Sequence, residues 1–98
     1  MAQPTITISA PRGNTPIPCQ ASGTASPSPG KTLTGMSCQI DSGPLIPIQN
    51  YNPNGGNWSC ALTQMDCPVV GKTYLLTVYA GDNSGNLGHG TSVFTRTS

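Results

Sequence analysis

Residues 71–86 read GKTYLLTVYAGDNSGN, and this stretch decides the fold of the chain. Its apolar side chains recur at every second position, the period expected of a strand with one buried face, and they are Tyr74, Leu76, Val78 and Ala80. Residues 82–86 (DNSGN) follow them. Asp, Asn and Gly tolerate the positive φ angles that a hairpin turn requires. The stretch therefore predicts a half-buried β-strand that ends in a tight turn.

Shorter alternating runs, separated by turn residues, lie on both sides of this strand. They predict further strands at residues 5–9, 17–25, 32–41, 45–48, 58–62 and 91–96. Residues 50–57 (NYNPNGGN) are expected to form a polar loop, and no apolar spacing typical of a helix occurs. In the last strand Val93 and Phe94 are adjacent, so only one of them can face inward.

Many short strands with frequent turns indicate an all-β fold. We expect an antiparallel β-sandwich of about seven strands, of the immunoglobulin-like or fibronectin III-like kind. The 12 glycines and 10 prolines agree with the many turns that such a fold needs. The 98 residues fit one domain, residues 1–98, with a single core.

Composition limits the classes of function. Only 7% of the residues are charged and the net charge is +1. Nucleic acids and anionic membranes require concentrated Lys and Arg, so neither is an expected partner. No apolar run approaches the roughly 18 residues of a membrane span, and MAQPTITISAP lacks the features of a signal peptide. We expect a monomer when the domain is isolated.

Four cysteines in a small, weakly charged domain predict two disulfides and an oxidising compartment. Cys38 and Cys60 have inward parity on strands expected to face each other, and Cys19 and Cys67 fall at the same end of the sandwich. The favoured pairs are therefore Cys38–Cys60 and Cys19–Cys67. The rival connectivity, Cys19–Cys38 with Cys60–Cys67, stays open. Zinc ligation is disfavoured because no C-x-x-C spacing is present.

Three segments resemble bacterial immunoglobulin-like domains. They are residues 16–41 (PIPCQASGTASPSPGKTLTGMSCQID), 57–62 (NWSCAL) and 71–86, and residues 22–25 (SGTA) and 71–86 are the most specific. The resemblance implies an extracellular module, one of several in a surface protein, an adhesin or a polysaccharide-degrading enzyme. It implies as partners the neighbouring domains of a longer parent chain, glycans or a host surface protein. The family pattern has apolar residues where Cys19, Cys38 and Cys60 stand.

Catalytic chemistry is not expected. His89 is the only histidine and lies between Gly88 and Gly90, which indicates a loop, and no Gly-x-Ser-x-Gly motif occurs. No cofactor is expected either. Asp82, Asn83 and Asn86 carry oxygen atoms of the kind that calcium binds, but a tight turn accounts for the same residues.

Aromatic side chains are the best candidates for a binding role. Tyr51 in the polar loop and Tyr79, outward by parity, are the expected platforms for a sugar ring, and Leu75 points outward with Tyr79. Trp58 shares parity with Cys60 and is expected in the core. Tyr74 is expected to send its hydroxyl back to the upstream backbone. The sequence thus favours a non-catalytic spacer or interaction module, with a carbohydrate-binding accessory module as the alternative.

Overall fold

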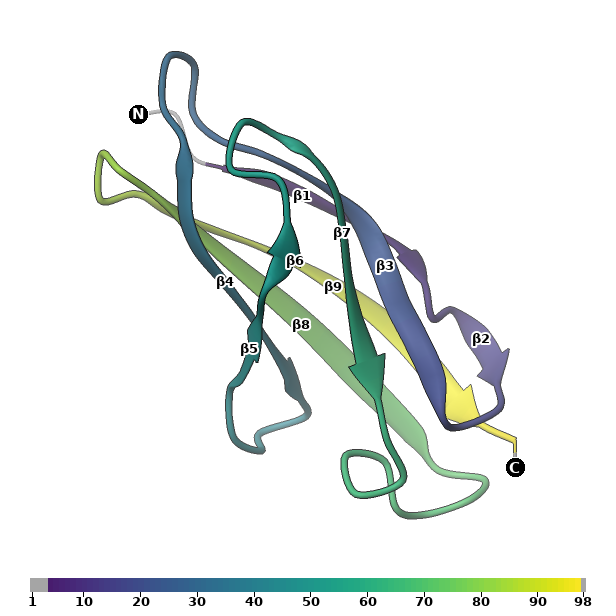
Figure 1. Cartoon of the computed structure of the whole chain (residues 1–98). Coiled ribbons are helices and arrows are strands. Elements are labelled where there is room, and N and C mark those ends of the chain that lie inside the picture. Colours follow the sequence, from purple (N-terminus) through teal and green to yellow (C-terminus); the bar gives the residue numbers. More distant parts are fainter. Residues whose placement is uncertain (1–3, 98) are drawn as a thin grey trace.

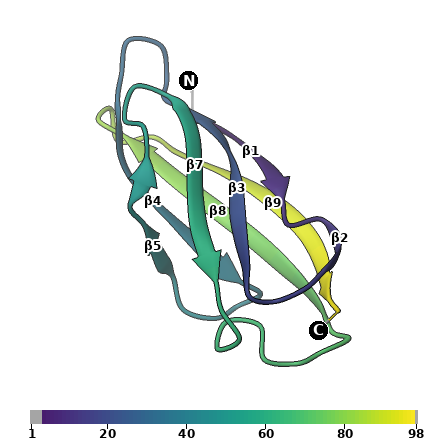
Figure 2. The ribbon, with the colours of Figure 1, turned by 45° about the vertical axis from the view of Figure 1, so that its right-hand side comes forward.

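Two sheets packed face to face make up the fold of residues 4–97, the part of the chain that the computed structural model describes. The first sheet contains, in spatial order, β1 (Thr5–Ala10), β3 (Cys19–Ser26), β7 (Gly56–Leu62) and β6 (Asn50–Tyr51). The second contains β2 (Gly13–Thr15), β9 (Leu87–Arg96), β8 (Thr73–Asp82), β4 (Leu33–Ile40) and β5 (Ile46–Ile48). Figures 1 and 2 show the two layers. The predicted all-β sandwich is confirmed.

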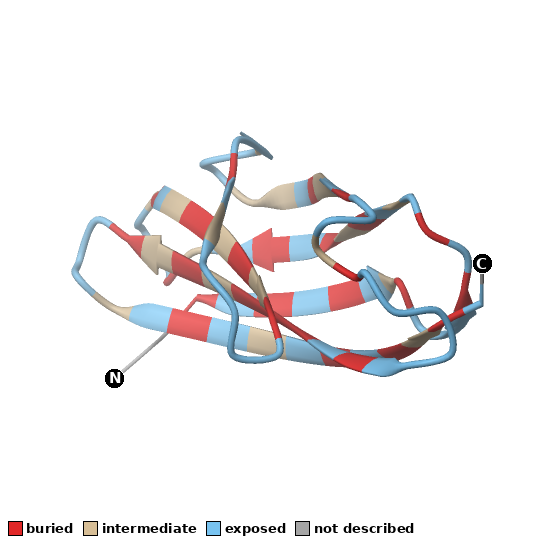
Figure 3. Cartoon of the chain, turned by 90° about the horizontal axis from the view of Figure 1, so that it is seen from below, coloured by how far each residue is buried: buried red, intermediate tan, exposed pale blue. Residues whose placement is uncertain are grey.

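Strand β8 is the segment that the opening stretch predicts, and it lies near the middle of the second sheet. It pairs with β9 on one side and with β4 on the other, antiparallel in both cases. The side chains predicted to share its buried face are all buried, namely Tyr74, Leu76, Val78 and Ala80. Buried and exposed bands alternate along the strands in Figure 3. A period of two therefore places one face of β8 in the core.

The core between the sheets is built around two large aromatic side chains. Trp58 on β7 and Phe94 on β9 are the largest fully buried side chains of the described residues. Phe94 stacks on Tyr74 with ring centroids 5.8 Å apart, a favourable aromatic geometry. Val93 is exposed, so the register of the last strand is settled with Phe94 inside.

The prediction of a loop over residues 50–57 is wrong in part. Asn50 and Tyr51 form β6, opposite Ser59 and Trp58, and β7 begins at Gly56 rather than at Trp58. The strand is only two residues long, and its Asn-rich flanks carry the composition of a loop. Strand β2 was not predicted. It pairs parallel with β9 after Pro11 has ended β1.

The loop predicted around His89 is also wrong, because β9 already begins at Leu87. Gly88 and Gly90 lie inside this strand for a steric reason. A Cβ atom at Gly88 would stand 2.0 Å from the carbonyl oxygen of Pro4, and one at Gly90 would stand 2.9 Å from that of Ile6. The N-terminal segment and β1 thus approach β9 so closely that only glycine fits.

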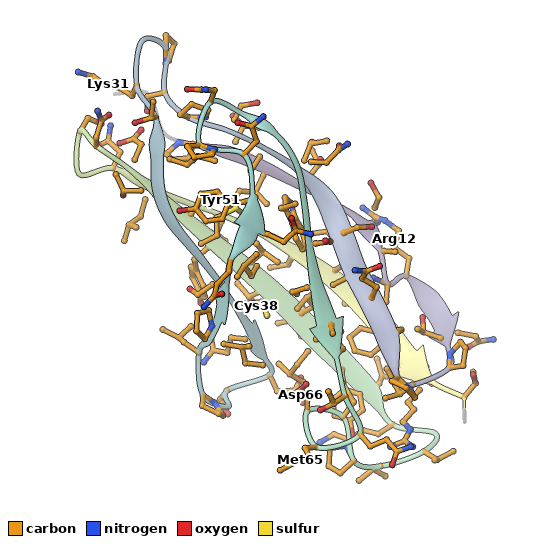
Figure 4. All side chains as sticks on the ribbon, in the orientation of Figure 1. Arg12, Lys31, Cys38, Tyr51, Met65 and Asp66 are labelled. Atoms are coloured by element: carbon orange, nitrogen blue, oxygen red, sulfur yellow. The ribbon has the colours of Figure 1, made fainter. Side chains whose placement is uncertain are left out.

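Hydrogen bonds fasten the connecting segments at both ends of the sandwich. At one end the β3–β4 loop, which carries Lys31, is bonded to the β8–β9 turn through Ser28 and Asp82. At the other end the β7–β8 connection, which carries Met65 and Asp66, is held by Tyr74 and by Arg96, whose Nη1 donates to the Cys67 carbonyl at 2.6 Å. Figure 4 labels Lys31, Met65 and Asp66 at these opposite ends.

Candidate functional site

The outer face of the second sheet carries the most apolar exposed surface on the strands. We call it the Tyr79 face and define it by its side chains, Ser37, Gln39, Leu45, Leu75, Tyr79, Leu87, His89 and Val93. The strand register places Val93 opposite Leu75, and it places both His89 and Ser37 opposite Tyr79. Leu87 is 69% exposed, Leu45 60% and Val93 56%. These side chains come from β4, β8, β9 and the segment before β5.

A shallow cavity of about 410 Å³ lies in the Tyr79 face. It is lined by Ser37, Gln39, Leu45, Tyr79 and Leu87. The Tyr79 hydroxyl donates to Oε1 of Gln39 at 3.2 Å, and its ring lies 6.2 Å from the imidazole of His89. A second hollow of about 240 Å³ adjoins it where Gly35 and Gly81 leave the backbone uncovered. The tyrosine ring is thus held between Gln39 on β4 and His89 on β9.

The structure separates the two tyrosines that the sequence proposes as platforms. Tyr79 and Leu75 lie together on the second sheet, as their shared parity requires. Tyr51 lies on β6 of the first sheet, where it is partly buried and packs against the core (Figure 4). Tyr51 and Tyr79 therefore do not form one site.

The calcium ligands suggested by the sequence have other partners. Asp82 is buried, and its Oδ2 accepts hydrogen bonds from the backbone nitrogen and hydroxyl of Ser28. Its Oδ1 accepts hydrogen bonds from the nitrogen and hydroxyl of Ser84 and from the nitrogen of Asn86. Oδ1 of Asn83 accepts from the nitrogen of Thr32 at 3.2 Å. The side chains of Asp82 and Asn83 and the backbone of Asn86 are thus engaged in fixing the turn.

The hydroxyl donors of Ser28 and then of Ser84 hold the pKa of Asp82 far below its ordinary value. The carboxylate therefore stays ionised across the physiological pH range. In the region that the structure describes, no group of three or more His, Cys, Asp or Glu side chains is placed to hold a metal ion.

The cysteines lie inside one half of the sandwich, and two of them face each other. Cys38 on β4 and Cys60 on β7 bring their Sγ atoms to 3.7 Å, although they belong to different sheets. An S–S bond is about 2.05 Å long, so neither predicted disulfide is confirmed, and all four thiols are free.

The hydrogen bond between Cys38 and Cys60, together with burial, raises the pKa of Cys38, and the same hydrogen bond lowers the pKa of Cys60. Burial, with Asp66 and Cys19 nearby, raises the pKa of Cys67 to about 11.

The sequence did not predict a further hollow, which lies on the other sheet from the Tyr79 face. It lies on the outer face of the first sheet and has a volume of about 400 Å³. We call it the serine groove, and its lining consists of Ser9, Ser22, Gly23, Asn50, Asn57, Trp58 and Ser59. Small polar residues are ordinary at exposed strand positions, so their outward parity alone did not indicate a binding surface. Only the strand register brings them together.

His89 is exposed on β9, and within residues 4–97 its imidazole makes no hydrogen bond or ion pair. Over the same residues the structure has no helix long and apolar enough to cross a membrane. Neither the known protein-family models nor the curated proteins contain a match to this chain.

Proposed function

We propose that the chain is a non-catalytic, immunoglobulin-like module of a secreted or surface-exposed bacterial protein, and that it serves as a spacer or interaction domain through its Tyr79 face. The observation that carries the proposal is the cluster of Leu45, Leu87 and Tyr79 around a cavity on the outer face of the second sheet. Exposed apolar side chains gathered around an aromatic ring are typical of surfaces that another protein covers.

The order of the strands supports the immunoglobulin-like type. The sheet β1-β3-β7-β6 matches the four-stranded sheet of that fold, and β9-β8-β4, extended by β5, matches its partner. Tyr74 supplies the tyrosine corner, because its hydroxyl accepts a hydrogen bond from the nitrogen of Val69 at 2.8 Å. The corner fixes the crossover from β7 to β8.

We include two disulfides in the proposal, Cys38–Cys60 and Cys19–Cys67. The 3.7 Å approach of the first two Sγ atoms, on strands of opposite sheets, supports that pair. Each bond would form by thiol–disulfide exchange with an external disulfide. That partner accepts the two electrons and is released as two thiols, while the protein thiols give up two protons. Such bonds agree with an extracellular location.

Absence of catalysis is part of the proposal. A hydrolytic site built on His89 would need a nucleophile on one side of the imidazole and an orienting carboxylate on the other. The neighbour across the strand pair is instead the ring of Tyr79. The surroundings of His89 therefore favour a contact surface.

Site-specific photocrosslinking in the parent protein tests the proposal. A photoreactive amino acid is placed at Leu87 on the Tyr79 face, and a matched one is placed at Thr24, which is exposed on the outer face of the first sheet. We expect adducts to a neighbouring domain or a second protein from position 87 and none from position 24. Equal adducts from both positions, or none from either, would reject the Tyr79 face as the contact surface.

A second candidate is a carbohydrate-binding accessory module of a polysaccharide-degrading enzyme. The observation that favours it is the serine groove, which offers hydroxyl and amide groups without a charged side chain in its lining. Tyr51 supports this candidate less, because its ring packs against the core.

A further inference from the structure

The serine groove runs across the strands of the first sheet. Ser22 on β3 lies opposite Ser59 on β7, and Ser59 lies opposite Asn50 on β6. Ser9, beside the irregularity in the pairing of β1 with β3, extends this row onto the fourth strand. Neighbouring strands are about 4.8 Å apart, so the row spans roughly 14 Å. The small side chains along this row leave a hollow on the surface of the sheet.

The chemistry of the groove is polar and uncharged. The strands β1, β3, β6 and β7 contain no charged residue. The nearest cation in sequence is Arg12, and its guanidinium is turned toward the backbone, where Nε donates to the Ile8 carbonyl at 3.0 Å. Hydroxyl groups and Asn amides both donate and accept hydrogen bonds. A ligand suited to this surface carries many neutral groups that do the same.

We propose that the serine groove binds a segment of an uncharged polysaccharide, along the row from Ser9 to Asn50. Sugar hydroxyls are neutral donors and acceptors, and the length of the row suits a short run of sugar units. An anionic polymer finds no cation in the lining, and a protein partner finds no exposed apolar anchor there. This inference rests on the second candidate function and moves its site from the two tyrosines to the row of small polar residues on the outer face of the first sheet.

Two hydrogen bonds organise the groove before any ligand arrives. Nδ2 of Asn50 donates to the Ser59 hydroxyl at 2.6 Å, and the hydroxyls of Thr7 and Thr24 bond to each other on the adjoining row. Side chains already held in place lose less rotamer freedom on binding, which lowers the entropic cost. The strand pairing beneath them holds the spacing of the row.

Backbone amide shifts of the isotope-labelled chain, titrated with xylohexaose, cellohexaose and maltohexaose, test the proposal. Polygalacturonate serves as the anionic comparison. We expect shifts at residues 9, 22, 50 and 59 with at least one neutral oligosaccharide and none with polygalacturonate. Ser22→Val and Ser59→Val should each weaken that binding by tenfold or more. Thr91→Val, a matched change at an exposed position of β9 outside both the serine groove and the Tyr79 face, should leave it unchanged.

The alternative outcomes separate this proposal from the functions above. Shifts confined to Ser37, Tyr79 and Gly81 would overturn the groove and retain a carbohydrate-binding module. No shift with any neutral oligosaccharide would overturn both and leave the protein-contact proposal for the Tyr79 face intact. Binding of polygalacturonate alone would also overturn the groove. If a valine variant fails to fold, Asn50→Ala at the exposed edge strand replaces it, with the same expected loss.

Discussion

Asp82 and Ser28 stand 54 residues apart in the chain, yet both the nitrogen and the hydroxyl of Ser28 donate to one carboxylate oxygen of Asp82. The other oxygen accepts from Ser84 and Asn86, within the same turn. One buried carboxylate thus joins the β3–β4 loop to the β8–β9 turn. Asn83 and Thr32 add two further bonds between the same segments.

This arrangement predicts how stability depends on pH. The pKa of Asp82 is lower in the folded chain than in the unfolded chain, so the folded state binds fewer protons. Its contribution to the free energy of unfolding is therefore full above the unfolded pKa of about 4, and it is lost as the pH falls below that value. We expect Asp82→Asn to be less stable than the wild type at pH 7 and the difference to shrink toward pH 2. Thermal unfolding between pH 2 and 7 measures it, and a difference that stays constant with pH would contradict the account.

The tyrosine corner predicts a modest and specific loss of stability. Tyr74→Phe removes the hydroxyl that accepts from the Val69 nitrogen while the ring stays packed on Phe94. We expect a loss of about 1 kcal/mol in the free energy of unfolding, the usual contribution of one hydrogen bond. Tyr79→Phe is the matched control, because its hydroxyl bonds to Gln39 on the outer face, and it should change stability by less than about 0.5 kcal/mol. Urea unfolding compares the two, and equal losses would count against the corner.

Gly90 and Gly35 make a matched pair for the close approach of β1 to β9. A Cβ at Gly90 would stand 2.9 Å from the Ile6 carbonyl oxygen, whereas one at Gly35 would meet open space. Gly90→Ala should therefore destabilise the fold by about 1–3 kcal/mol, as overpacking does. Gly35→Ala should stay within about 0.5 kcal/mol of the wild type. Chemical denaturation of both variants provides the test, and a neutral Gly90→Ala would show that β1 is not held against β9 in this way.

The cysteines predict a definite product after air oxidation or oxidative secretion. Mass spectrometry of peptides from the non-reduced protein should find Cys38 joined to Cys60 and Cys19 joined to Cys67. A peptide joining Cys60 to Cys67 would establish the rival connectivity.

In the reduced protein Cys67 should react slowly with alkylating reagents at pH 7, because its pKa of about 11 keeps it protonated. Rapid alkylation of Cys67 in the folded protein would contradict its burial.

Alternation of apolar residues predicted the parts of the fold that have one buried face. Residues 73–82 illustrate this, because a period of two sends Tyr74 to the core and Tyr79 to the surface whatever the partner strands are. The short edge strands β2 and β6 carry too few residues for a period to be visible. Gly88 and Gly90 were read as turn residues, because the sequence does not reveal that another backbone lies against them.

The candidate sites were predictable only in part. Parity alone brought Leu75 and Tyr79 together, since both lie on one strand. Tyr51 was misplaced because its burial depends on the pairing of β6 with β7. The serine groove depends on the register of four strands, and that register joins Ser9 to Asn50 across 41 positions of the chain (50 minus 9). No local pattern encodes such a relationship.

Hydroxyl-radical footprinting tests the central claim most directly, because it reports the solvent exposure of individual side chains. The isolated chain is compared with the same chain in the longer surface protein that we propose as its parent. Met65, which is 92% exposed at the end of the sandwich, provides an internal reference away from the Tyr79 face. We predict that Leu45, Tyr79 and Leu87 become protected in the parent protein while Met65 is modified equally in both. Equal modification of Tyr79 and Leu87 in the two states would contradict the claim that this face is a contact surface.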